Sequence, residues 1–190
     1  FSIFFLCSGV HDKGIAWIFF IIWNVHYFNR SVLFPLRQKQ TARCPVAIVF
    51  SAVFFNIING FTNGYFLGYL AQYDFNYVYS LQFIIGLIVL VLGVVINVKS
   101  DNILIGIKKK HNDYQIPNGF MYKYISCPNY FGEIIEWIGF YIMTASAPAL
   151  VFVFWTMCNL VPRSISNHNW YINKFSDYPK NRKAVIPFLI

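Results

Sequence analysis

Charged side chains are scarce in this sequence. They make up 12% of the 190 residues, whereas hydrophobic residues make up 57%. A typical soluble domain is about 25% charged, so a soluble globular protein is excluded and an integral membrane protein is indicated. Since a membrane-spanning helix needs about 20 apolar residues, the length allows about five spans with their loops.

Motifs that identify common enzymes and metal sites are also lacking. The sequence has no nucleophile elbow, P-loop or H-E-x-x-H pair, and its glycine-rich residues 59–64 lie inside an apolar run, which excludes a Rossmann fold. The four cysteines have no C-x-x-C spacing and the four histidines are scattered. Neither a metal site nor a disulfide framework is therefore indicated.

A charged leader and a small-residue cleavage site are missing from the start of the sequence. The chain begins with Phe1 rather than Met, and residues 1–10 are apolar. This pattern does not fit a signal peptide and is typical of the end of an earlier span. We therefore expect the chain to be a fragment whose N-terminal spans are missing.

Five apolar runs follow. They cover residues 14–28, 45–70, 81–98, 130–143 and 147–161. Flanking aromatic residues would complete the shorter ones. We therefore predict an all-α fold, a polytopic transmembrane helix bundle with about five complete spans, in which residues 1–190 form a single membrane domain.

The basic residues alternate with these runs. If each run crosses the membrane once, 14 of the 15 lysines and arginines lie on one side, with Lys13 alone opposite. The positive-inside rule makes the basic side cytosolic. Some of these cations would touch anionic headgroups. Nucleic acid is a poor alternative, because no soluble domain is present to read a groove.

Two carboxylates interrupt the fourth run. Glu133 and Glu136 are three residues apart, so a helix places them on one face, with Asn129 one turn earlier. An ionisable group at bilayer depth is costly and marks a functional site by default. Interhelical hydrogen bonding is the alternative, but two acids and an amide exceed what helix packing needs.

More polar side chains lie at or just inside the predicted cytosolic boundary. Cationic groups neutralise phosphates, while carboxylates and amides bind hydroxyls or a carboxamide. Helix capping and snorkelling are the alternatives. We interpret the set as a nucleotide site beneath a lipid-facing pocket. Its members are Tyr27 and Arg30 at one span end, Asn97 and Asp101 one turn apart at another, the face of Asn129 and Glu133, and Arg163 and Tyr171 after the last span.

Several motifs, in order along the chain, resemble the C-terminal domain of the steroid 5-alpha-reductases. They are residues 26–30 (HYFNR), 97–101 (NVKSD), 129–139 (NYFGEIIEWIG) and a tail with Arg163, Trp170-Tyr171 and residues 177–188. The resemblance implies a seven-span enzyme of the endoplasmic reticulum membrane, with its cofactor side cytosolic. Such an enzyme uses NADPH to reduce the 4,5 double bond of 3-oxo-4-ene steroids.

The same resemblance implies roles for particular residues. Tyr27 would be catalytic and contact the steroid ketone, and Glu136 would also line the substrate site. The implied partners are a lipophilic steroid and membrane lipid, with no metal and no obligate protein partner. The residues implied to bind the cofactor are Arg30, Asn97, Asp101, Lys108, Tyr114, Asn129, Glu133, Arg163, Asn167 and Tyr171.

The chain also departs from the family pattern. The Gln-Glu pair that supplies an acid near the ketone would lie upstream of Phe1, Asn167 replaces the usual histidine, and Ile105 replaces an arginine. Two alternatives therefore stay open. One is a trans-2-enoyl-CoA reductase of the same superfamily, against which Glu136 with Trp137 favours the steroid branch. The other is a non-catalytic membrane paralogue.

Overall fold

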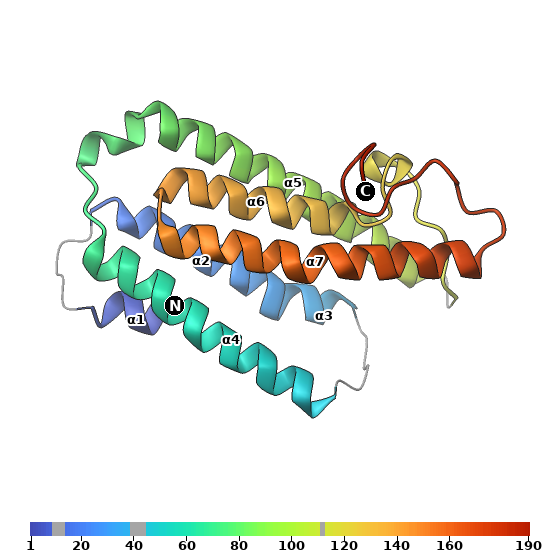
Figure 1. Cartoon of the computed structure of the whole chain (residues 1–190), viewed down its shortest axis with the longest axis horizontal. Coiled ribbons are helices and arrows are strands. Elements are labelled where there is room, and N and C mark those ends of the chain that lie inside the picture. Colours follow the sequence, from blue (N-terminus) through green and yellow to red (C-terminus); the bar gives the residue numbers. More distant parts are fainter. Residues whose placement is uncertain (9–13, 39–44, 111–112) are drawn as a thin grey trace. The chain divides into compact units, whose positions relative to one another are not determined.

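A computed structural model describes residues 1–8, 14–38, 45–110 and 113–190 (Figure 1). Lys13, Lys39 and Arg43, which the charge argument used, lie outside the described residues. Helices dominate the fold, as predicted. In order they are α1 (Ser2–Leu6), α2 (Ala16–Phe28), η1 (Asn29–Leu33), α3 (Phe34–Gln38), α4 (Val46–Tyr65), η2 (Phe66–Leu70), η3 (Phe75–Tyr79), α5 (Leu81–Lys110), η4 (Phe120–Lys123), α6 (Pro128–Thr144) and α7 (Ala147–Lys174).

Three of the described helices are long and apolar enough to cross a membrane. They are α4 with η2, α5 and α7, of 25, 30 and 28 residues. The predicted runs at 14–28 and 130–143 also form helices, but α2 and α6 have only 13 and 17 residues. The all-α prediction is confirmed, while the five-span topology stays a prediction.

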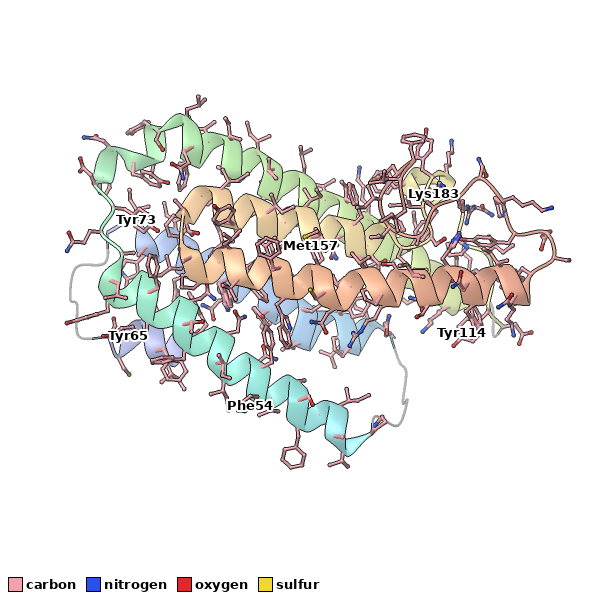
Figure 2. All side chains as sticks on the ribbon, in the orientation of Figure 1. Phe54, Tyr65, Tyr73, Tyr114, Met157 and Lys183 are labelled. Carbon is pink, nitrogen blue, oxygen red and sulfur yellow. The ribbon has the colours of Figure 1, made fainter. Side chains whose placement is uncertain are left out.

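The outer faces of these helices are apolar. Only 17% of the most apolar window of α4 is buried, and Phe54 on this helix is 67% exposed. Figure 2 shows the rings of Phe54 and Tyr65 projecting from α4. Water would not favour so large an exposed apolar face, so lipid is the medium that this helix fits.

The chain divides into two compact units. The first contains residues 1–84 and 144–149, and the second contains residues 85–143 and 150–190. In the first unit, α1 lies directly against α4 and η2 because glycines leave room for its backbone. A Cβ on Gly64 would lie 2.6 Å from the Phe1 oxygen, and one on Gly68 would lie 2.6 Å from the Phe5 oxygen. Stacking of Phe1 on Trp23, with ring centroids 4.6 Å apart, joins α2 to the same group.

In the second unit, α5 and α6 are in backbone contact along four glycines. Gly86 and Gly93 of α5 face Gly139 and Gly132 of α6, so the two helices are antiparallel. A Cβ on Gly93 would lie 2.6 Å from the Glu136 Cα. Small residues of this kind let membrane helices approach closely. The contact fixes which polar groups of the two helices meet.

The C-terminal tail folds back onto the start of α6. Lys183 forms a parallel bridge with Ile125, and the amide of Cys127 donates to the Ala184 oxygen over 3.0 Å. Val185 is fully buried in a core with Ile134 of α6 and Leu160 of α7. In Figure 1 the red tail lies beside the yellow segment that precedes α6. The tail is thus an integral part of the second unit.

Two helices extend beyond the apolar runs that predicted them. The run that ends at residue 98 becomes a helix that ends at Lys110, and the run that ends at residue 161 becomes a helix that ends at Lys174. Apolar residues stop where the membrane would stop, but polar residues with good helix propensity continue the helix into water. Tyr171, expected after the last span, therefore lies on α7.

Candidate functional site

A buried polar network joins α5 to the first turn of α6. Asn97 donates from Nδ2 to the main-chain oxygen of Asn129 over 2.9 Å, and Asn129 donates from Nδ2 to Oδ1 of Asp101 over 3.1 Å. All three side chains are at most 8% exposed. Asn97 and Asp101 are four residues apart on α5, so both face α6. The structure brings together three residues that the sequence predicted for one site.

Tyr122 extends this network, and sequence reasoning missed it. It is 1% exposed, and its hydroxyl donates to the main-chain oxygen of Ser100 over 3.3 Å. Burial raises the pKa of Tyr122, and the negative charge of Asp101 adds to the effect. Tyr122 therefore stays a neutral donor beside the Asp101 carboxyl group. Its buried aromatic ring anchors the connection that precedes α6.

The two glutamates of α6 differ in their surroundings. Glu136 is 4% exposed, and its backbone lies against Gly93. Glu133 is half-buried, with its Oε2 atom shielded from solvent. α6 is helical from Pro128 to Thr144, so Asn129, Glu133 and Glu136 share a face as expected. Glu136 and the Oε2 atom of Glu133 are therefore both withdrawn from solvent, where a carboxyl group needs hydrogen-bond partners.

One face of α7 presents Arg163, Asn167 and Tyr171 at intervals of four residues. Asn167 donates from Nδ2 to Sγ of Cys127 over 3.8 Å, and so connects α7 to the residue that precedes α6. Burial raises the pKa of the Cys127 thiol to about 11, although hydrogen bonds from Asn167 and Ser164 oppose the rise. Cys127 is thus a neutral thiol at physiological pH.

A second hydrogen-bonded cluster holds the C-terminal tail, and its members were missed as site residues. Ser126 Oγ lies 2.6 Å from both Nδ1 of His168 and the hydroxyl of Tyr178. Tyr178 stacks on Tyr171, with ring centroids 5.4 Å apart. Arg182 is 4% exposed and donates to the Pro117 oxygen over 3.0 Å. The tail motif that carried the resemblance contains Tyr178 and Arg182, and this was the only sequence signal for them.

The exposed ends of α5 and α7 carry cations and aromatic rings. Lys108 lies in the last turn of α5 and is exposed. Tyr114 packs edge-on against Trp170 at 4.9 Å, and Nζ of Lys174 lies 5.8 Å from the Tyr114 ring centroid. Figure 2 shows Tyr114 beside the last turns of α7. Since α6 is antiparallel to α5, this end also holds the Asn129 network.

Tyr27 and Arg30 belong to the first unit. Tyr27 is half-buried and stacks on Trp23, with ring centroids 5.3 Å apart. The guanidinium of Arg30 lies 4.9 Å from the Phe34 ring centroid. The sequence placed both residues in one site with Asn129. That Tyr27 and Arg30 share a site with Asn129 stays a prediction.

The second unit therefore combines two kinds of groups at one end. Buried carboxylates and amides suit hydroxyl and carboxamide groups, and exposed Arg163 and Lys108 suit phosphates. Together with the membrane-length helices, this defines a membrane protein with a cluster of polar groups at one end of the helices of its second unit. The nucleotide site that the sequence placed there stays a prediction.

Comparison with known proteins is consistent with this class and identifies the family. The profile of the 3-oxo-5-alpha-steroid 4-dehydrogenases matches residues 42–190. Steroid 5-alpha-reductase DET2 of Solanum lycopersicum is 40% identical over 183 residues, which cover 94% of this chain and 71% of that protein. The 3-oxo-5-alpha-steroid 4-dehydrogenase 1 of Homo sapiens is 35% identical over 173 residues, 90% of this chain and 67% of that protein.

The chain belongs to the steroid 5-alpha-reductase family, as the sequence motifs predicted. It spans about two thirds of the length of these relatives. Steroid 5-alpha-reductase DET2 of Gossypium hirsutum, for example, is 43% identical over 171 residues, which cover 86% of this chain and 66% of that protein.

Proposed function

We propose that this protein is an NADPH-dependent membrane oxidoreductase that reduces the 4,5 double bond of a 3-oxo-4-ene steroid. The observation that carries the proposal is the buried network of Asn97, Asp101 and Asn129, which joins a carboxylate and two amides in a family member. Such groups suit the hydroxyls and the carboxamide of a dinucleotide. The cations nearby suit its phosphates.

The residues of the second unit fit NADPH by their chemistry. Asp101, Asn129 and Glu133 would hold polar groups of the nucleoside, and Arg163 and Lys108 would hold phosphates. The remaining residues proposed to bind the cofactor are Arg30, Asn97, Tyr114, Asn167 and Tyr171. NADPH supplies a hydride when it is bound. The protein itself must position the nucleotide and exclude water.

The substrate end of the reaction is assigned to Tyr27 and Glu136. Tyr27 would donate a hydrogen bond to the C3 ketone oxygen and stabilise the negative charge that develops there as C5 accepts the hydride. A proton then adds at C4. Glu136 would line the substrate site. Both assignments follow from the family resemblance and from the positions of these residues near polar groups.

The location proposed for the protein is the endoplasmic reticulum membrane, with a multi-pass topology and a cytosolic cofactor side. Within the second unit, α5 ends, α6 begins and α7 ends at the same end, where Lys108, Lys123, Lys174 and Lys183 also lie. This clustering supports the positive-inside argument for that unit. A soluble nucleotide would reach the site from that side.

The test is an assay of microsomes that contain the full-length protein. We expect NADPH-dependent conversion of a 3-oxo-4-ene steroid to its 4,5-saturated product. Microsomes with Asp101→Ala, which breaks the buried network, are the matched control. Turnover of a trans-2-enoyl-CoA without turnover of the steroid would assign the protein to the enoyl-CoA branch. Lack of turnover on both substrates, with the protein folded, would support a non-catalytic paralogue.

A further inference from the structure

The first unit contains a pocket of about 200 Å³ beside Tyr27. Trp23 and Tyr27 of α2 line one wall, and Asn56, Asn59 and Gly60 of α4 line another. Complete small-molecule sites are about 300–1,000 Å³. The pocket therefore fits one end of a lipid-sized ligand, between aromatic rings and amide groups.

The orientation of the Asn59 amide follows from its neighbour on α4. Asn63 donates from Nδ2 to the main-chain oxygen of Asn59 over 3.2 Å and to its Oδ1 over 3.0 Å. Reversing the Asn63 amide would place its Oδ1 against the main-chain oxygen, so the two donations fix its orientation. Oδ1 of Asn59 is consequently the acceptor, and its Nδ2 is the group left to donate.

The Nδ2 atom of Asn59 has no hydrogen-bond partner within the described chain. Asn59 is only 5% exposed. A buried donor without an acceptor lowers stability, and such atoms are uncommon in folded proteins. Asn59 lines the pocket, so a ligand bound there would supply the acceptor atom that this donor lacks.

The amide nitrogens of the other two asparagines of the pocket each have a hydrogen-bond acceptor. Asn24 accepts from Ser2 Oγ over 2.6 Å and donates from Nδ2 to the Phe20 oxygen over 2.8 Å. Asn56 donates from Nδ2 to the Ala52 oxygen over 2.8 Å. Asn59 is therefore the asparagine of this pocket whose amide nitrogen is buried without any acceptor among the described residues, and Tyr27 lines the same pocket. The Asn59 donor favours an oxygen that only accepts, such as that of a ketone.

We propose that Asn59 donates a hydrogen bond from Nδ2 to the carbonyl oxygen of the enone substrate and is a further catalytic residue. The inference rests on the proposed function. In that reaction the hydride brings two electrons to C5, and the electron pair of the C4–C5 double bond moves toward the C3 carbonyl. The oxygen carries negative charge until a proton adds at C4, and a fixed donor stabilises that charge. Asn63 is the positioning residue, since it orients the Asn59 amide.

The test compares the binding of two steroids to the purified full-length protein in detergent. One is a 3-oxo-4-ene steroid, and the other is its counterpart without the C3 oxygen. We expect the wild type to bind the ketone on the order of tenfold more tightly. Asn59→Leu removes the amide and Asn59→Asp keeps its size but replaces the donor with an acceptor, so both should remove this preference.

Thr62→Val is the matched control. Thr62 lies on the same helix, is exposed and does not line the pocket, so its variant should keep the preference. Thermal unfolding of each variant shows whether it is folded. If Asn59→Leu does not fold, Asn59→Asp provides the test. An unchanged preference in a folded Asn59 variant, or no preference in the wild type, would overturn the assignment.

Turnover separates this inference from the proposed function. In an active enzyme, Asn59→Asp should lower turnover at saturating steroid, because the donor matters most in the transition state. If the protein shows the Asn59-dependent preference but no NADPH-dependent turnover, the proposed reductase function is wrong and the ketone site is supported. If the protein turns over the steroid but its preference for the ketone does not depend on Asn59, the ketone site is wrong and the reductase function is supported.

Discussion

The Nδ2 atom of Asn129 lies 3.1 Å from Oδ1 of Asp101 and joins the first turn of α6 to α5. Both side chains are buried, so this hydrogen bond is made where water cannot replace it. It also fixes the orientation of the side-chain amide of Asn129. The main-chain oxygen of Asn129 accepts a second hydrogen bond, from Nδ2 of Asn97. The pair is thus a structural link as well as part of the proposed cofactor site.

The first prediction concerns this link. Asn129→Asp replaces the donor with a second carboxylate next to Asp101, and we expect a loss of about 3 kcal/mol in stability together with weaker NADPH binding. Thermal unfolding and nucleotide titration in detergent measure the two effects. Asn169→Asp makes the same change at an exposed position of α7 and is the control. Equal unfolding temperatures for the two variants would contradict the prediction.

The second prediction concerns the contact between α5 and α6. A Cβ at Gly93 would lie 2.6 Å from the Glu136 Cα, so Gly93→Ala should separate the helices and cost roughly 1–3 kcal/mol. Gly106 is also on α5, but a Cβ there would meet no described atom within 4 Å beyond the adjoining backbone of its own helix. Gly106→Ala should therefore leave the unfolding temperature unchanged or raise it slightly. A Gly93 variant as stable as the Gly106 variant would be evidence against the close contact.

The third prediction assigns Glu133 to the cofactor. Glu133→Gln keeps the shape but removes the charge, so hydrogen bonds from the nucleotide to this group should weaken. We expect NADPH affinity to fall more than steroid affinity, and separate titrations of the two ligands measure this. Unchanged NADPH affinity would remove Glu133 from the cofactor site.

The fourth prediction concerns the phosphates. Arg163→Ala and Lys108→Ala should each weaken NADPH on the order of tenfold, and weaken NADH less if the cation contacts the 2′-phosphate. Lys110→Ala is the control, since Lys110 lies in the same last turn of α5 but is not assigned to the site. An equal loss for both nucleotides would leave a general phosphate role and exclude contact with the 2′-phosphate.

The fifth prediction concerns Tyr27. Tyr27→Phe keeps the ring that stacks on Trp23 and removes only the hydroxyl. A catalytic donor should then show lower turnover at saturating steroid, whereas an aromatic residue of the membrane interface should lose almost nothing. Tyr65→Phe makes the same change on an exposed ring of α4. Full turnover in the Tyr27 variant would make its role structural.

Hydropathy predicted most of the helices of this fold but not where they end. Apolar runs located α4, α5, α6 and α7, because burial in lipid requires such runs. The ends at Lys110 and Lys174 were missed, since a helix can continue through polar residues in water. The sequence also could not show which helices touch.

Only part of the candidate site was predicted, because spacing in the sequence reports which side chains share a helix face but not which distant segments meet. Spacing along one helix placed Asn129 and Glu133 on a common face, and it also placed Asn97 and Asp101 one turn apart at the end of another span. Tyr122, Ser126 and Tyr178 were missed because their partners are 22 to 52 residues away in the sequence. Contacts of that range depend on how the tail folds back, which no local pattern reports.

The length of α5 has a kinetic consequence. Its 30 residues span about 45 Å, whereas the hydrocarbon core of a bilayer is about 30 Å thick. The turns that carry Asp101 and Lys108 therefore extend beyond the lipid. Under the proposed function, the nucleotide would then exchange with the aqueous phase, while the steroid would arrive from the lipid phase. Added lipid should then dilute the steroid within the membrane and raise its apparent KM, and the apparent KM for NADPH should stay constant.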